Sequence, residues 1–499
     1  MLTPVEAETP SAYPTLDPGS LFVPGSTLLS STPAEAPSTG RHRPGLVLAA
    51  LLTCQLMIVL DATVMNVALP RIRDDLGFST TGLAWVMNSY TLVFGGLLLL
   101  GGRAGDLLGR RRLLIAGVAL FTVASLAGGF ADSPATLVAA RVAQGLGAAL
   151  AAPSTLALLA TTFTEPRERM RALALFSGMS SAGFAVGLIA GGLLTEWLSW
   201  RSVLFINVPF GALIIVLAVR HVREPARHPA RLDLLGAATG SAGIAALVYG
   251  FIRAASDGWR DGYTVGALVA GVALLATFVL VEARTAQPLL PLRLFADRNR
   301  AAAYLNFFLG PMAGMSMFFF LTQYLQDVHG YRALSTGFAF LPMALILFAT
   351  TRFIPVLLPR FGPKPMAVTG TLLMGTGVAL LSRLDVDTTY AAGLLPSMLL
   401  MGVGMGLAFA PLNVVIMGSV PPADAGAAGG VLQTMQQAGA TLGLAILVTV
   451  FGAASRDAAA AGVGPDQVLL AGMTDAFVAG ALIAGLAVLV ALTFRRDRP

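Results

Sequence analysis

Long apolar stretches alternate with short polar segments along this chain. Each apolar stretch holds roughly 20 residues, the length that a helix needs to cross a bilayer. We therefore expect an all-α polytopic membrane protein. The pattern predicts fourteen spanning helices, at 45–69, 82–102, 112–131, 136–163, 171–195, 203–219, 234–254, 264–283, 301–325, 334–358, 366–383, 390–417, 426–451 and 471–494.

Composition supports a membrane protein and excludes several classes of site. The chain is 56% hydrophobic and only 12% charged, whereas soluble domains carry about 25% charged residues. A single cysteine, Cys54, leaves no disulfide framework, and the 4 histidines fall in predicted loops or tails, so we expect no metal site. The net charge of +6 comes from arginines that flank the stretches, so we expect no nucleic-acid partner.

The distribution of basic residues predicts the orientation. Cytoplasmic loops of membrane proteins carry an excess of Lys and Arg. If the N-terminus is cytoplasmic, most of the 32 basic residues lie inside, including Arg495 and Arg496 in the tail 495–499. An even number of spans is then required, with both termini cytoplasmic. Residues 1–44 are rich in Pro, Ser and Thr, which predicts a disordered cytoplasmic tail rather than a signal peptide.

Two halves are recognisable. The Gly- and Arg-rich segment after the second stretch is repeated in a weaker form at 358–365, after the tenth stretch. Carriers are often built from such internal repeats. We therefore predict an N-terminal six-helix bundle at 45–220, a second bundle at 301–494, and two inserted spans with cytoplasmic linkers at 221–300.

Arg141 is a charge inside a stretch that must cross the membrane. Such a charge is kept with a partner or a water-filled path, so it is a functional-site candidate. Its predicted partner is Asp61, about two-thirds of the way along the first stretch and the only carboxylate well inside any stretch. A carboxylate that gains or loses a cationic neighbour changes its proton affinity. The pair is our candidate for proton coupling; the alternative is a static packing or capping role for Asp61.

The polar segment after the second stretch is a candidate conformational gate. Gly102 and Gly109 allow a tight turn close to neighbouring helices. Asp106 can pair with an arginine, and Arg110 and Arg111 follow it. A charge clamp made in one conformation only would bias a two-state carrier. The alternative is an ordinary positively charged inner loop.

The fifth stretch carries glycines at four-residue spacing. Gly183, Gly187 and Gly191 would share one smooth helix face. Faces of this kind let membrane helices approach each other closely. We predict a helix-packing role for the three glycines.

Five segments resemble signatures of the major facilitator superfamily. The loop 102–114 and the arginine segment 141–149 resemble its general signatures. The segments 60–70, 200–211 and 330–342 are similar to signatures of its fourteen-span drug:proton antiporters, the EmrB/QacA type. The likeness extends from about residue 45 to residue 494. The chain departs from the antiporter signature at Leu188. The signature usually has a Gly-Pro pair at this place, and this chain has Gly187 followed by Leu188.

The resemblance implies a major facilitator fold with a cavity lined by the first, fourth, ninth and twelfth spans. Amides are costly when they face lipid, and Met- and Phe-rich walls suit a promiscuous apolar site. These criteria select Gln144, Asn306, Phe307, Met315, Gln323, Tyr324 and Asn413 as candidate cavity residues.

The resemblance also implies the function. We expect a monomeric, multi-pass carrier in a bacterial cytoplasmic membrane that exports lipophilic small molecules in exchange for protons, with the proton gradient in place of any cofactor. The chain has no nucleotide-binding Gly-Lys-Ser/Thr loop, no paired histidines and no Gly-x-Ser-x-Gly elbow, so we expect no enzyme. An importer, by proton symport or facilitation, is the alternative. A non-transporting sensor would leave Asp61 and Arg141 unexplained.

Overall fold

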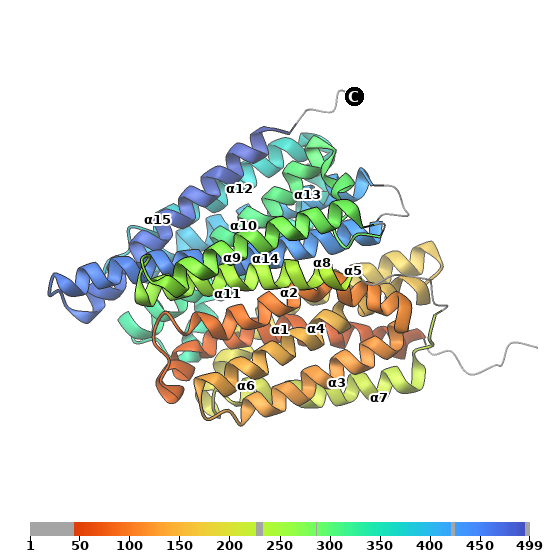
Figure 1. Cartoon of the computed structure of the whole chain (residues 1–499), viewed down its shortest axis with the longest axis horizontal. Coiled ribbons are helices and arrows are strands. Elements are labelled where there is room, and N and C mark those ends of the chain that lie inside the picture. The colour runs from red at the N-terminus through yellow and green to blue at the C-terminus, as the bar shows by residue number, and fades with distance from the viewer. Residues whose placement is uncertain (1–43, 226–232, 286, 421–424, 495–499) are drawn as a thin grey trace, which may run out of the picture. The chain divides into compact units, whose positions relative to one another are not determined.

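A computed structural model describes residues 44–225, 233–285, 287–420 and 425–494, which form helices and no strand (Figure 1). The predicted tails at 1–44 and 495–499 lie almost entirely outside these residues. The helices are α1 (Pro44–Leu76), α2 (Ala84–Leu108), α3 (Arg110–Gly129), α4 (Pro134–Thr162), α5 (Pro166–Trp197), α6 (Ser202–Phe205), α7 (Asn207–His221), α8 (Leu234–Asp257), α9 (Gly262–Arg284), η1 (Leu292–Phe295), α10 (Arg298–Gln323), η2 (Tyr324–Val328), α11 (Ala333–Phe361), α12 (Pro363–Leu381), η3 (Tyr390–Leu394), α13 (Leu395–Gly418), α14 (Ala425–Ala460) and α15 (Pro465–Leu492).

Each predicted stretch falls on a helix, and most of these helices are long and apolar enough to cross a membrane. Within the described residues, 13 helical segments meet that criterion, with α6 and α7 counted as one. The fifth stretch lies on α5, whose described apolar part, Ala182–Trp197, is shorter than a span. The prediction of an all-helical, multi-pass membrane protein is confirmed. The sequence predicted fourteen spans, and the described residues contain 13 such segments.

Local sequence explains several helix boundaries. Ser133 caps the start of α4 in a capping box. The Ser133 hydroxyl accepts from the backbone N–H of Thr136, and the Thr136 hydroxyl accepts from the backbone N–H of Ser133. Asp261 caps α9 by accepting from the backbone N–H of Thr264 at 2.9 Å. The turn between α2 and α3 requires Gly109, whose φ of +106° is strained for any residue with a Cβ.

The helices pack in two groups. In the first, α1 packs against α4, α5 and α7, and α3 packs against α4 and α7. In the second, α10 packs against α13, α14 and α15, and α12 packs against α13 and α15. We call α1–α7 the N-terminal bundle and α10–α15 the C-terminal bundle. The pair α8 and α9 crosses the middle of Figure 1, where α8 contacts α2 of one bundle and α14 of the other.

The two bundles meet along α2 with α14 and along α5 with α11. Thr441 on α14 donates to Thr91 on α2 at 2.9 Å. The backbone N–H of Leu334, in the first turn of α11, donates to Glu196 on α5 at 3.1 Å. Arg73 near the end of α1 forms a two-pronged ion pair with Asp327 of η2, at 2.7 and 3.1 Å. The last two contacts lie at the end of the bundles that the orientation predicts to be outside.

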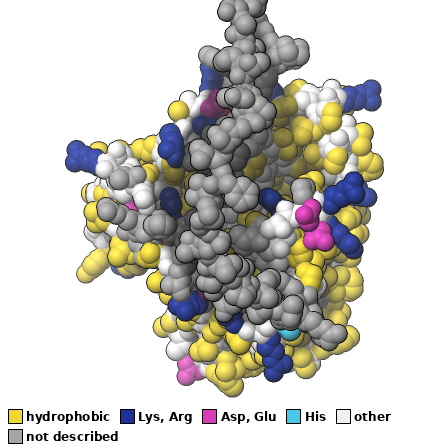
Figure 2. All heavy atoms as spheres, turned by 90° about the vertical axis from the view of Figure 1, so that its right-hand side faces the viewer, with side chains coloured by type: hydrophobic (Ala, Val, Ile, Leu, Met, Phe, Trp, Pro, Cys, Tyr) yellow, Lys and Arg dark blue, Asp and Glu magenta, His cyan; other side chains and the backbone are white. Residues whose placement is uncertain are grey.

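Basic side chains are common on one face of the protein. Figure 2 looks onto the right-hand side of Figure 1, where α5 begins and α7 ends. Lys and Arg side chains stand at several places around this face, and Asp and Glu side chains are fewer. The described bases near it include Arg110, Arg111, Arg112, Arg167, Arg169, Arg171, Arg220 and Arg223.

Candidate functional site

Asp61 lies in the middle of α1 with its side chain fully buried. The sequence placed it two-thirds of the way along a span that ended at residue 69. The structure corrects this position, because α1 continues through Pro70 to Leu76. Pro70 is tolerated because neighbouring helices in a membrane protein can satisfy the backbone groups that proline frees.

Arg141 on α4 is the direct partner of Asp61. Its Nη1 donates to Asp61 Oδ2 at 2.6 Å, and both side chains are 0% exposed. Nε donates to the backbone carbonyl of Val86 on α2 at 3.1 Å. The guanidinium also stands 4.3 Å from the centre of the Tyr90 ring, within the range of a cation–π interaction. The two charges therefore compensate each other inside the protein.

Three further polar side chains complete the site. Gln144 on α4 and Asn207 on α7 both donate to Asp61 Oδ1, at 2.9 and 2.8 Å. The same two amides donate to the hydroxyl of Ser125 on α3, at 2.7 and 3.3 Å. Gln144 Oε1 in turn accepts from Arg141 Nη1 at 3.0 Å. We call Asp61, Ser125, Arg141, Gln144 and Asn207 the buried network.

The sequence interpretation missed Asn207 and Ser125. A signal for Asn207 was present, because it is an amide inside the apolar stretch 203–219 and amides are costly when they face lipid. Ser125 carries no such signal, since a serine in a membrane helix can satisfy itself on its own backbone. Gln144 was predicted as a cavity residue, and the structure places its side chain in the network.

The network contains one buried acceptor and one buried donor without a partner in the described structure. They are Asn207 Oδ1 and Arg141 Nη2. Every group bonded to Asp61 is a donor, so the arrangement suits an ionised carboxylate. If Asp61 took up a proton, rotation of the Asn207 amide by half a turn would offer its free oxygen as an acceptor. The Asn207 side chain can therefore serve Asp61 as a donor when the carboxyl is ionised and as an acceptor when it is protonated.

The candidate gate residues lie in the last two turns of α2, at Gly109 between α2 and α3, and at the start of α3. Asp106 forms an ion pair with Arg110, one helical turn away. Arg111 donates to the backbone carbonyls of Ala218 and Val219 at the end of α7, at 3.2 and 2.6 Å. Gly102 is not tightly packed, since a Cβ there would be 3.7 Å from Pro153. All of these contacts stay within the N-terminal bundle in this conformation.

Glu224, which the sequence interpretation missed, anchors the same turn. Its carboxylate accepts from the backbone N–H groups of Arg111 and Arg112, at 3.1 and 3.3 Å. These are unsatisfied donors at the start of α3, where a negative charge is favourable. A Cβ on Gly109 would lie 2.7 Å from this carboxyl group. Glycine is therefore required there both for its φ and for space.

The glycines of α5 face α1. A Cβ on Gly183 would lie 3.1 Å from Leu56, and one on Gly191 would lie 2.7 Å from Val64. At Gly187 an added Cβ would overlap with the side chain of Thr63, two residues from Asp61. The close approach of α5 thus fixes the part of α1 that carries the acid.

The predicted cavity residues of the C-terminal bundle have mixed surroundings. Asn306 and Gln323 are fully buried, and each has an amide oxygen without a partner among the described residues. Phe307 packs against Phe409, with ring centres 5.2 Å apart. Tyr324 donates to the carbonyl of Asp385 at 2.7 Å, a structural bond. Asn413 is exposed, and the side chain of Met315 lies outside the described residues.

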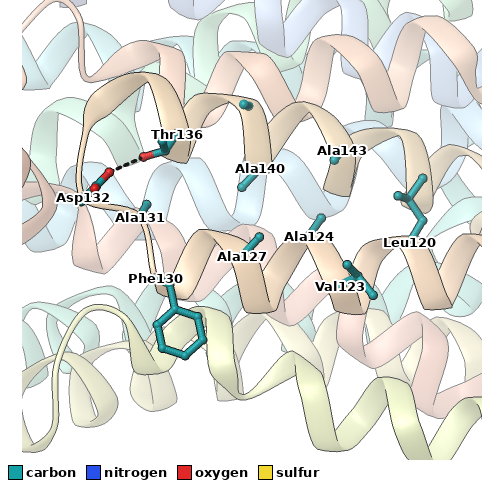
Figure 3. Close-up of a pocket in the computed structure, with 11 residues that line it drawn as sticks. Leu120, Val123, Ala124, Ala127, Phe130, Ala131, Asp132, Thr136, Ala140 and Ala143 are labelled. Atoms are coloured by element: carbon teal, nitrogen blue, oxygen red, sulfur yellow. Dashed lines mark hydrogen bonds between the residues drawn. The ribbon is translucent and has the colours of Figure 1, made fainter.

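A pocket of about 480 Å³ lies between α3 and α4 (Figure 3). Its wall consists mostly of alanines, with Phe130 at one end and Asp132 accepting a hydrogen bond from Thr136. Ala124, Ala140 and Ala143 belong to this wall and each precedes a residue of the buried network. The pocket is not the predicted cavity, because that cavity would involve α1, α4, α10 and α13. No group of three or more potential metal ligands is present among the described residues.

Comparison with known proteins agrees with this architecture. The profile of the Major Facilitator Superfamily matches residues 51–444. The puromycin resistance protein pur8 of Streptomyces alboniger is 45% identical over 81% of each chain. The cephamycin export protein CmcT of Amycolatopsis lactamdurans is 41% identical over 83% of this chain and 86% of its own. A solved bacterial homolog of the human lysosomal transporter Spinster aligns with a TM-score of 0.64 at 17% identity, over 92% of this chain and 99% of its own.

Proposed function

Because the chain belongs to the major facilitator superfamily, we propose that it is a proton-coupled antiporter that exports lipophilic small molecules across a bacterial cytoplasmic membrane. The observation that carries the proton coupling is the buried network. Asp61 is fully buried, is paired with Arg141, and has in Asn207 a neighbour that can serve it in both protonation states. An intramembrane acid of this kind is a candidate proton carrier.

The direction of transport is inferred from the relatives. Two proteins that match more than four-fifths of the chain are named for puromycin resistance and for cephamycin export. A lincomycin resistance protein of Streptomyces lincolnensis is 37% identical over 81% of the chain. We infer that this chain also exports a toxic organic molecule.

Alternating access would open and close the contacts between the bundles. Arg73–Asp327 and Glu196–Leu334 hold the bundles together at the predicted outer end. We propose that these contacts form the outer gate and break when the carrier releases its cargo. The turn between Asp106 and Arg110, to which Glu224 is bound, would move with the N-terminal bundle at the opposite end.

We further propose fourteen spans, as in the EmrB/QacA type, with both termini cytoplasmic and a monomer as the working unit. The helix α5 has 32 residues, which at about 1.5 Å per residue exceeds the hydrocarbon thickness of roughly 30 Å. The excess of bases on the face in Figure 2 supports a cytoplasmic assignment for that face.

Transport in inverted membrane vesicles tests the proposal. When respiration acidifies the vesicle interior, an antiporter that exports from the cell should accumulate a lipophilic dye inside, and an uncoupler should abolish the accumulation. A proton symporter would expel the dye instead, and a facilitator would be indifferent to the uncoupler. Vesicles with the Asp61→Asn variant should fail to accumulate the dye, as wild-type vesicles do when the uncoupler is present.

A further inference from the structure

The helices α8 and α9 carry two buried carboxyl groups at one end of the pair, which we call the inserted pair. Asp233 caps the start of α8, where its Oδ1 accepts from the backbone N–H of Gly236 at 2.7 Å. Glu282 lies in the last turn of α9, and its Oε2 accepts from the backbone N–H of Leu290 at 2.8 Å. Asp233 is 8% exposed and Glu282 is 3% exposed. The sequence had suggested Asp61 as the only deep acid, because Glu282 stands at the edge of its apolar stretch.

The remaining oxygen of each acid points to the same place. Asp233 Oδ2 and Glu282 Oε1 are buried and have no hydrogen-bond partner among the described residues. A Cβ placed on Gly236 would lie 2.6 Å from Glu282 Oε1 and 2.8 Å from Asp233 Oδ2. The two oxygens thus converge on the space that Gly236 leaves empty, which is too small for another side chain.

No described base neutralises these acids. On α9, Arg284 is exposed. Arg300 is engaged with the backbone carbonyls of Leu294 and Arg293 and with that of Ser419. The start of α14, at 425–440, contains no charged residue.

The nearest base on α2 is Arg103. Contacts of Thr81 with Ser256, of Trp85 with Tyr249 and of Gly96 with Ser241 show that α2 and α8 run antiparallel. Continuing this register brings Arg103 level with Asp233. Neither of the two unpartnered oxygens, however, receives a hydrogen bond from it.

The other end of the same helix pair is different. There Asp261 accepts from Arg253 at 2.7 Å, and this guanidinium holds the pKa of the Asp261 carboxyl below its usual range. An acid with a base beside it stays ionised. Two buried carboxyl groups without a base cannot both ionise at reasonable cost, so such pairs retain one proton.

We propose that Asp233 and Glu282 form a proton-binding site, separate from the buried network, in which one proton is held between Asp233 Oδ2 and Glu282 Oε1. Uptake of the proton converts two facing carboxylates into one carboxylic acid that donates to one carboxylate. Glu282 also anchors the linker at Leu290, which leads into α10 of the C-terminal bundle. Binding of the proton therefore controls the strength of the contact between the inserted pair and the linker to that bundle.

Infrared difference spectroscopy tests the site directly and does not require transport. We would use purified full-length protein carrying Asp61→Asn, so that the network acid does not contribute, and raise the pH from about 6 to about 10, a range that includes the titration of documented buried carboxyl groups. The carbonyl band of a protonated carboxylic acid should disappear over this interval. The band should disappear at a lower pH in Asp233→Asn and in Glu282→Gln, where an amide donor faces the remaining carboxylate, and at the parent's pH in the control Asp261→Asn. The same titration in the parent and in both site variants, or no band in the parent, would overturn the proposal.

Thermal unfolding over the same pH interval provides a second measurement. The parent should lose several degrees in melting temperature as the proton leaves, because two facing charges then remain buried. Glu282→Gln should fold and be nearly insensitive to pH, because the amide oxygen still accepts from Leu290 and the NH₂ group donates to Asp233. Equal pH sensitivity in the parent and in Glu282→Gln would refute the shared proton. Stabilisation of the parent at high pH by sodium or calcium chloride, but not by choline chloride, would also refute it and assign the site to a metal cation.

Discussion

The ion pair between Asp61 and Arg141 permits a graded test at Arg141. Arg141→Ala leaves the Asp61 carboxylate with two amide donors and no counter-charge in a fully buried place. Removing one partner of a buried ion pair costs about 3–5 kcal/mol, which corresponds to a change of about a hundredfold or more in an equilibrium. Asp61 would escape this cost by remaining protonated, so the carrier would lose its proton exchange.

Arg141→Lys should be milder. Lysine keeps the positive charge but not the planar fork that reaches Asp61, Val86 and Gln144 together. The loss of two hydrogen bonds, at about 1 kcal/mol each, predicts partial transport. The expected order of substrate-induced proton release is wild type, then lysine, then alanine, with the alanine variant at least about tenfold below wild type.

The assay is proton release from proteoliposomes, with unfolding in detergent measured in parallel to separate coupling from stability. The double variant Asp61→Asn/Arg141→Ala removes both charges, so it should recover most of the stability that Arg141→Ala loses and none of the coupling. Equal transport by the alanine and lysine variants would refute the charge-pair reasoning. So would a double variant whose loss of stability is the sum of the two single losses, because contacting charges must show coupling.

Three other variants or substrates test separate parts of the account. Asn207→Leu removes the free acceptor as well as a donor to Asp61, so it should impair proton release more than Ser125→Ala does; equal effects would contradict the role given to the Asn207 amide. Arg73→Gln should weaken the outer gate and increase labelling of introduced cysteines in the cavity from the outside; unchanged labelling in both Arg73→Gln and Asp327→Asn would show that the pair does not hold the gate. Neutral or monovalent lipophilic compounds should be preferred over dications of the bis-biguanide kind, because desolvating an unpaired second charge costs several kcal/mol. Resistance profiles in an efflux-deficient host measure this preference, and protection against dications alone would contradict it.

The helices and the central ion pair could be predicted because single-residue chemistry constrains them strongly. Roughly 20 apolar residues have few stable arrangements other than a spanning helix. A charge within such a stretch needs an opposite charge nearby. Asp61 is the only carboxylate well inside any stretch, so the sequence alone identifies it as the partner of Arg141. The pairing at 2.6 Å therefore follows from an argument that needs no tertiary detail.

Other features depend on packing between distant segments. Glu224 reaches the start of α3 across more than a hundred residues of sequence, and nothing in its local surroundings indicates that contact. The hydrogen bond from the Tyr324 hydroxyl to the carbonyl of Asp385 likewise joins residues 61 positions apart, and the sequence does not indicate it. Asn207 differs from these, because the reasoning that selected Gln144 would have selected it as well.

The location of the ion pair also limits how coupling can work. Asp61 and Arg141 both belong to the N-terminal bundle, on the packed helices α1 and α4. Rigid rocking of one bundle against the other cannot separate them, contrary to the simplest picture of an acid that exchanges neighbours during transport. A change in the proton affinity of Asp61 must then come from movement of α1 against α4, or from water or cargo that enters the network. The close glycine contacts of α5 with α1 transmit movement to that point, since α5 also packs against α11 of the other bundle. Displacement of α11 would thus reach Asp61 through Gly187 and Thr63.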